Sequence, residues 1–371
     1  MKTIPFISLE HLNYSIKEQL KDAFESVMLS NNFILGENVS EFEKEYAKYC
    51  NTKYCVGVAS GLDALTLSLK SLDIQAGDEV IVPANTFIAS LISISSVGAT
   101  PVLVDVNRDD FNIDVSKVED LITDKTKGIM AVHLYGQSAN LDKLKLISVK
   151  HGIHLIEDNA QAQGAKEGNV VTGSLGIVGC TSFYPGKNLG AYGDGGAVTT
   201  NDITVYNKLL ALRNYGSTEK YFHDVVGFNS RLDELQAAFL RVKLKKMEGW
   251  NLERNKKASR YKENLKDIID VELPITNEGN QHVFHLFVIK VKKRNELKYF
   301  LHENGVNTLI HYPIPCHLQK AYLDLNYKRG DFPITEILSE QILSLPLYIG
   351  MKDDDIDYVC NAIRNFYKGN D

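Results

Sequence analysis

Short apolar runs alternate with amphipathic segments through the first half of the chain. Five runs rich in small and β-branched residues are predicted to be strands, at 54–58, 79–83, 101–105, 128–132 and 154–158. The segment after the first run carries leucines at helical spacing and is predicted to be a helix. Apolar strands separated by helices are typical of a largely parallel sheet with helices on both faces. We therefore expect an α/β fold.

The pattern changes in the last third of the chain. A long amphipathic helix is predicted to begin near Ser230, with an apolar stripe that includes Leu232, Leu235, Phe239 and Val242. Beyond it we expect a strand over 283–288, a helix near 296–304 and a further strand over 306–310. These patterns predict a large domain over 1–250, including an N-terminal arm, and a smaller α+β domain over 251–371.

Polar residues just past the predicted strands indicate where a ligand binds. Ser60, Asn85 and Asp158 each stand at such a strand end. Ligands of open α/β sheets bind at the carboxyl ends of the strands. Ser60 is also a good cap for the helix that follows, and free amide groups at a helix start bind phosphate. By itself, however, this turn favours the start of an ordinary capped helix over a phosphate site.

Lys187 lies in a segment, TSFYPGKNLGAYGDGGAV over 181–198, that sets it apart from a surface lysine. Pro185 and Gly186 end the strand-like entry and predict a turn just before the lysine. A free lysine titrates near ~10.4, and burial can lower that pKa by up to ~3–5 units. A lysine on a tight turn behind a buried strand is placed for such a shift. The alternative is a solvated lysine on a loop.

Asp158 ends an apolar strand in the segment EDNAQAQGA over 157–165. A carboxylate in that position is poorly placed unless it meets a cation. It could instead cap the next helix. The residues alone leave both interpretations open.

Together these segments resemble those of the DegT-type nucleotide-sugar aminotransferases, which are fold-type I enzymes that use pyridoxal phosphate (PLP). The resemblance extends from about Phe33 to His317 and is most specific at the lysine segment and at GFNSRLDELQAA over 227–238. It implies a mostly parallel, seven-stranded sheet between helices. It also implies that Lys187 carries PLP as a Schiff base and moves protons, and that Asp158 faces the protonated pyridine nitrogen.

The same resemblance assigns the other cofactor contacts. The phosphate would be bound by the backbone amides of Gly61 and Leu62, where leucine replaces the threonine of most family members, and by the hydroxyl of Ser182. Phe87 would stack on the cofactor ring, and Gln161 would lie on its hydroxyl side. Asn229 would reach the phosphate from a neighbouring subunit, which requires a homodimer with shared active sites. Asn159 and Gln163 depart from the commoner alanine and histidine and receive no role.

The form of the lysine segment resembles the branch that acts at the 3-keto position of dTDP-6-deoxyhexoses. The expected reaction takes an amino group from glutamate and gives a dTDP-3-amino-3,6-dideoxyhexose. Tyr184, and Tyr221 from the partner subunit, would face the sugar. The stretch from His311 to His317 resembles the loop that faces sugar and pyrophosphate, and His317 is the preferred contact within it.

Other functions stay open at this point. The substrate could be a 4-keto sugar or a UDP-linked sugar, and the chain could be a sensor that binds PLP or a nucleotide sugar without catalysis. A PLP-dependent sugar dehydratase of the same fold is disfavoured, because histidine replaces the lysine in those enzymes.

The composition of the chain excludes several classes of protein. The chain has 371 residues, of which 44% are hydrophobic, so it can bury one large core and a smaller second one. A net charge of −6 argues against a surface that binds nucleic acid. The sequence contains no run of 18 apolar residues, so we expect no helix that spans a membrane. Five scattered cysteines without a C-x-x-C pair fit a reduced, cytoplasmic protein. The histidines form no cluster with cysteines, so no metal is expected.

Overall fold

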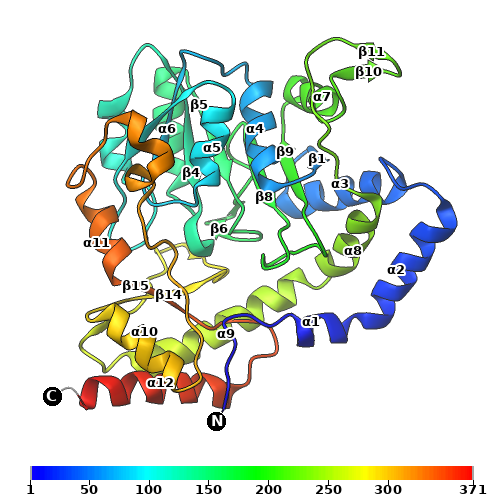
Figure 1. The fold of residues 1–371 in the computed structure, drawn as a ribbon. Coiled ribbons are helices and arrows are strands. Elements are labelled where there is room, and N and C mark those ends of the chain that lie inside the picture. The colour runs from blue at the N-terminus through cyan, green and yellow to red at the C-terminus, as the bar shows by residue number, and fades with distance from the viewer. Residues whose placement is uncertain (1, 370–371) are drawn as a thin grey trace.

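The computed structural model describes residues 2–369, and a seven-stranded sheet lies at its centre (Figure 1). Its strand order is β1 (Tyr54–Val58), β9 (Gly196–Thr200), β8 (Val178–Ser182), β5 (His154–Asp158), β4 (Thr126–Val132), β2 (Glu79–Pro83) and β3 (Thr100–Val104). Six of the seven strands run in one direction, and β9 alone is antiparallel to its neighbours. The five predicted strands are confirmed to within two residues at either end. The α/β fold class is confirmed with them.

Helices cover both faces of this sheet because its strands are apolar on both sides. In β2, Val80 and Val82 pack into the cluster under α4 (Gly61–Ser71), α5 (Ala89–Ser96) and α7 (Ile203–Leu212). Ile81 points the other way, into the cluster under α6 (Leu141–His151). On that second face, α3 (Glu37–Cys50) and α8 (Glu234–Leu244) cover the β1 and β9 side. The sheet is thus sealed from water except at its edges.

A second core lies around a small antiparallel sheet of β12 (Val271–Glu272), β14 (Phe287–Val291) and β15 (Ile342–Leu345). The helices α9 (Met247–Leu265), α10 (Arg294–Glu303) and α12 (Asp353–Lys368) pack against it. Ile4 joins this core, since its backbone pairs with Gly305 and Asn307. The predicted domain boundary at residue 250 falls inside α9 and stays a prediction.

The remaining elements lie at the edges. They are α1 (Glu10–Ser15), α2 (Lys17–Ser30), α11 (Pro333–Gln341), the hairpin of β10 (Ser217–Glu219) and β11 (Phe222–His223), the small sheet of β6 (Lys166–Glu167), β7 (Val170–Val171) and β13 (Asn280–Gln281), and five short 3-10 helices (Val115–Lys117, Glu119–Leu121, Leu134–Gly136, Cys316–Leu318, Lys320–Leu325). Within residues 2–369 no helix is both long enough and apolar enough to cross a membrane.

The predicted start of the long helix near Ser230 was wrong. The helix α8 begins at Glu234, and Asp233 occupies the cap position. The hydroxyl of Ser230 is engaged elsewhere: it donates to Asp63 Oδ2 at 2.7 Å and accepts from the Ala59 amide at 3.2 Å. A partner 167 residues away in sequence therefore overrides the local capping signal.

One predicted strand of the small domain begins later than expected, and another does not form. The stretch 283–286 is irregular, because the Val283 amide donates to Gly136 O at 2.9 Å and the Leu286 amide to Tyr135 O at 3.3 Å. Only from Phe287 onward does the chain pair as β14. The stretch 306–310 makes isolated bridges at Val306 and Leu309 instead of a strand.

Candidate active site

The carboxyl ends of the parallel strands bring the predicted site residues to one edge of the large sheet. Ser60 follows β1, Asn85 follows β2, Asp158 ends β5, and the Lys187 turn follows β8. Because these four strands point in the same direction, all four residues lie at the same edge. This is the place where open α/β sheets bind their ligands.

Lys187 follows β8, and the residue as a whole is half-buried. The Lys187 backbone amide donates to Tyr184 O at 2.8 Å, which closes the turn predicted at Pro185 and Gly186. Burial lowers the pKa of Lys187 to about 8, and the negative charge of Asp158 opposes that shift. The amine is therefore partly neutral near physiological pH.

Asp158 is 6% exposed and is held by two donors. Ser90 Oγ donates to its Oδ2 at 2.8 Å, and the Ala160 amide donates to its Oδ1 at 3.2 Å. Since the Ser90 proton is used in this way, Thr86 Oγ1, which lies 2.8 Å from Ser90 Oγ, must be the donor in that pair. Burial raises the pKa of Asp158, and these bonds together with the charge of Lys187 oppose the rise.

The capping interpretation of Asp158 fails, because turns and then β6 follow it, not a helix. The Asp158 carboxylate thus lies at the end of a buried strand, where burial disfavours its negative charge. A cation placed against it would favour its ionised form.

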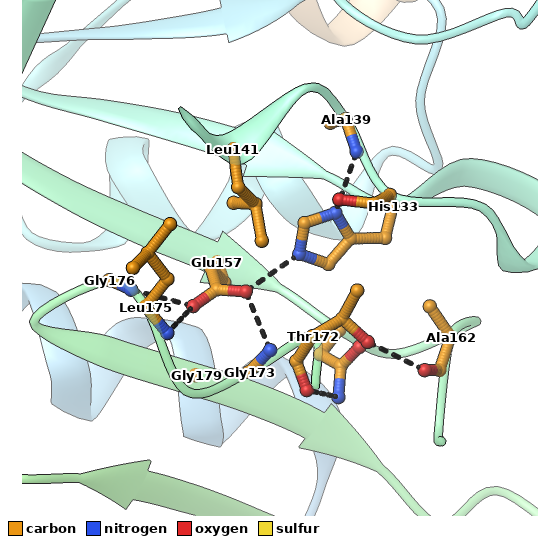
Figure 2. Close-up of polar contacts among 12 residues, drawn as sticks. His133, Ala139, Leu141, Glu157, Ala162, Thr172, Gly173, Leu175, Gly176 and Gly179 are labelled. Atoms are coloured by element: carbon orange, nitrogen blue, oxygen red, sulfur yellow. Dashed lines mark hydrogen bonds and ion pairs between the residues drawn. The ribbon is translucent and has the colours of Figure 1, made fainter. Parts of the chain in front are cut away.

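Glu157, next to Asp158, faces the opposite side of the sheet and fixes this strand end (Figure 2). Its carboxylate accepts from the amides of Gly173, Leu175 and Gly176 and from His133 Nε2, at 2.5–2.9 Å. His133 Nδ1 accepts from the Ala139 amide at 3.1 Å, so the ring proton is on Nε2. Every hydrogen bond of this buried network is satisfied in the structure, which makes β5 a rigid support for Asp158.

The turn at Ser60 has the shape of an anion site. Ser60 Oγ accepts from the Asp63 amide at 3.0 Å, so Ser60 is the helix cap, as predicted. The amides of Gly61 and Leu62 find no acceptor within residues 2–369, as expected for a first helical turn. A Cβ at position 61 would lie 2.5 Å from Ser182 Cβ, so only glycine allows this approach. Two free amides and the Ser182 hydroxyl therefore converge, and a phosphate group fits them.

Aromatic side chains form a wall of the site. The Phe87 ring is 52% exposed, and its centroid lies 5.6 Å from that of Tyr312. Gln161 Nε2 donates to the Tyr312 hydroxyl at 3.2 Å, and Gln161 Oε1 accepts from the Tyr135 amide at 2.8 Å. Burial, and then the charge of Lys187, lower the pKa of His311 to about 4. His311 and Tyr312 thus border the same space as Lys187 and Asp158.

The residues predicted to contact the sugar, or to reach the site from a neighbouring subunit, divide into two groups. Tyr184 is 60% exposed and stands on the Lys187 turn. Tyr221 lies between β10 and β11, and Asn229 follows that hairpin; both are exposed in the single chain.

His317 does not lie in the site. Its ring has no exposed surface, its Nε2 pairs with Glu336 Oε1 at 3.1 Å, and it packs edge-on against Phe332. A ring sealed in this way cannot contact a substrate, so the preference for His317 over His311 is corrected.

Sequence reasoning missed several residues at the site. Thr86 and Ser90 carry only a weak signal in the sequence, because hydroxyl residues just past a predicted strand are common, and Thr86 lies in the bend before α5 while Ser90 lies in its first turn. Tyr312 and His311 were within a segment already singled out. Within residues 2–369, no group of three or more His, Cys, Asp or Glu side chains is arranged to hold a metal ion.

Comparisons with known proteins agree with this geometry. The chain is 47% identical over 363 residues to the dTDP-3-amino-3,6-dideoxy-alpha-D-galactopyranose transaminase of Aneurinibacillus thermoaerophilus, covering 98% of this chain and 99% of that one. The crystal structure of S. venezuelae DesV in complex with a ketimine intermediate matches with a TM-score of 0.97 and 41% identity, over 99% of both chains. The structure of NtdA from Bacillus subtilis with bound cofactor PMP matches with a TM-score of 0.93 and 32% identity, over 99% of this chain and 86% of that one.

The sequence profile of one family matches nearly the whole chain, over residues 14–364. The chain belongs to the DegT/DnrJ/EryC1/StrS aminotransferase family.

Proposed function

We propose that this chain is a PLP-dependent aminotransferase for dTDP-linked 3-keto-6-deoxyhexoses, with glutamate as the amino donor. Its product is a dTDP-3-amino-3,6-dideoxyhexose. The observation that carries the proposal is that Lys187 and the buried Asp158 lie at one edge of the sheet, where burial lowers the pKa of Lys187 to about 8 and the charge of Asp158 opposes that shift. The 47% identity to a dTDP-sugar transaminase supports the substrate class.

The residues at this edge fit PLP end to end. The Gly61 and Leu62 amides and the Ser182 hydroxyl would hold its phosphate, and Asp158 would face its ring nitrogen. Phe87 offers an exposed ring face for stacking, and Gln161 would lie on the hydroxyl side. Lys187 would bind the aldehyde carbon. Bound PLP supplies an electron sink that stabilises negative charge at the carbon beside the nitrogen.

Each side chain of this site then has a different role in the reaction. Lys187, with a pKa of about 8, takes a proton from one carbon and returns it to another near neutral pH. Asp158 would face the ring nitrogen, and a positive charge there would favour the ionised carboxylate. Ser90 donates to the Asp158 carboxylate and orients it. Tyr184, His311 and Tyr312 lie where the sugar would enter.

We further propose a homodimer with shared active sites. The stretch 215–228 around the β10–β11 hairpin exposes six large apolar side chains: Tyr215, Tyr221, Phe222, Val225, Val226 and Phe228. Exposed apolar side chains that lie together are typical of a surface that binds another protein chain. Asn229 directly follows this stretch. A second copy seated there would bring its Asn229 and Tyr221 to the phosphate and sugar ends of the site. All five cysteines are buried free thiols, which supports our placement of the reaction in the reduced cytoplasm.

A heterodimer with one lesion on each chain tests the shared site. We expect a purified dimer of one Lys187→Ala chain and one Asn229→Asp chain to have about half of the wild-type turnover, because one of its two sites escapes both lesions. Each homodimer should be inactive or nearly so, since a carboxylate in place of the Asn229 amide would repel the phosphate. Two affinity tags allow the hybrid to be isolated. If the hybrid gains nothing over the two homodimers, Asn229 does not act across the interface.

Product analysis tests the reaction itself. We expect the purified protein to convert a dTDP-3-keto-6-deoxyhexose with ¹⁵N-glutamate into a sugar with ¹⁵N on carbon 3, as read by NMR. A panel that includes 4-keto and UDP-linked sugars serves as the control. Label on carbon 4, or preference for a uridine nucleotide, would overturn the substrate assignment. PLP binding without response to any amino donor would favour a sensor.

A further inference from the structure

The turn that carries Lys187 is held by the residue next to it. Asn188 is 4% exposed, and its side-chain nitrogen Nδ2 donates to Asn251 Oδ1 at 3.0 Å and to Val283 O at 3.2 Å. Asn251 lies on α9, and Val283 belongs to the irregular stretch before β14. Asn188 therefore ties the lysine turn of the large sheet to the second core.

These two bonds fix the orientation of the Asn188 amide. A backbone carbonyl can only accept, so the group facing Val283 must be the nitrogen. Both Nδ2 protons are then used, and Oδ1 faces the other way, 3.2 Å from His285 Nδ1. Since Oδ1 can only accept, His285 Nδ1 must carry a proton. Burial lowers the pKa of His285 well below its ordinary value, so the ring is neutral and its Nε2 holds a lone pair.

His285 is itself held on a rigid support. The stretch 283–286 is bonded to Gly136 and Tyr135 of the large domain, and a Cβ at position 136 would lie 3.0 Å from the His285 amide. The 3.2 Å contact with Asn188 Oδ1 places the His285 ring one residue from Lys187 in the chain, and the charge of Lys187 adds to burial in lowering the pKa of His285. The His285 imidazole thus contacts the lysine turn from a segment, 283–286, that hydrogen bonds hold in place.

We propose that His285 is a positioning residue for Lys187, which acts by donating its Nδ1 proton to Asn188 Oδ1. Without that donor, the Asn188 oxygen is buried and unpaired, and the turn loses the bond that sets where the Lys187 amine points. The proposal rests on the proposed function, since it is the lysine of that site that is positioned. It assigns His285 no contact with substrate and no proton transfer of its own.

Substitutions can separate the two ring nitrogens. In His285→Asn, the amide nitrogen stands near the place of Nδ1 and can still donate to Asn188. In His285→Gln, the longer chain places its amide near Nε2 instead. His285→Phe keeps an aromatic ring, slightly larger than imidazole, and removes both nitrogens. If Nε2 acted directly on the lysine, glutamine and not asparagine would restore function.

The main readout is covalent attachment of PLP to Lys187 in cofactor-free protein, trapped by borohydride and located by peptide mass. We expect His285→Phe and His285→Gln to slow attachment about tenfold or more, and His285→Asn to stay within about threefold of wild type. Turnover of the holoenzyme should follow the same order, with the loss in kcat and little change in KM for the sugar. Thermal unfolding checks that each variant is folded.

Selective rescue by asparagine supports the proposal, and any other pattern overturns it: rescue by glutamine alone, equal loss in all three variants, or no loss in any of them. A wild-type protein that binds PLP at Lys187 but fails to transfer nitrogen would contradict the proposed function and leave the attachment test of His285 intact.

Discussion

Lys187→Ala is expected to abolish transamination while PLP still binds. The alanine variant has no amine to hold the cofactor aldehyde and no group to move a proton between carbons. Loss of a positioned acid and base costs about 10²–10⁴-fold, and loss of the covalent link adds to that. The phosphate end of the site is untouched, so the variant should still bind PLP without a covalent bond. Turnover assays and absorbance titration with PLP measure the two effects.

The matched control is a second buried lysine outside the site. Lys257 on α9 is 8% exposed and donates to Met351 O at 2.6 Å. Lys257→Met should keep turnover within about threefold of wild type when corrected for folded protein. Borohydride should fix PLP to wild type and to this control at Lys187, and fix none to Lys187→Ala. Turnover near the wild-type rate in Lys187→Ala would refute the assignment.

Asp158→Asn is expected to lower kcat/KM by about 10³-fold, or ~4 kcal/mol of transition-state stabilisation. A neutral amide cannot keep the ring nitrogen protonated, and an unprotonated ring is a poor electron sink. The amide is nearly the same size as the carboxylate, and its one oxygen can still accept from Ser90, while the weaker 3.2 Å bond from the Ala160 amide is lost. Steady-state kinetics with glutamate and the keto sugar give the size of the loss.

Ser90→Ala offers a graded comparison. It removes the 2.8 Å bond to Asp158 Oδ2 but leaves the carboxylate in place, so the loss should be nearer tenfold. Activity of Asp158→Asn within about tenfold of wild type would count against Asp158 as the partner of the ring nitrogen. A larger loss in Ser90→Ala than in Asp158→Asn would do the same.

The strands that position the site could be predicted from the sequence, because they depend on local patterns of apolar residues. Alternating apolar runs located β1 to β5 closely, and parallel strands place Ser60, Asp158 and the Lys187 turn at one edge without further information. The resemblance then named the roles that these residues would have. Neither step needed side-chain detail.

Side-chain partners far apart in sequence were not predictable in this way. The burial of His317 depends on Glu336 of α11, and the late start of α8 depends on the bond from Ser230 to Asp63. The link from Asn188 to His285 spans 97 residues, and His285 was expected on a strand that in the structure begins only at Phe287. Hydrogen bonds of this kind are decided by tertiary packing, which overrides local propensity.

The most direct test of the account is the pKa of the Lys187 amine in cofactor-free protein, with and without Asp158. The pH dependence of labelling by an amine-selective reagent, followed at the Lys187 peptide, gives this value. We expect half-maximal labelling near pH 8 in the wild type. In Asp158→Asn it should fall lower, because the charge of Asp158 raises the pKa of Lys187. An amine that titrates near ~10.4, or equally in both proteins, would contradict a lysine and a carboxylate that share one site.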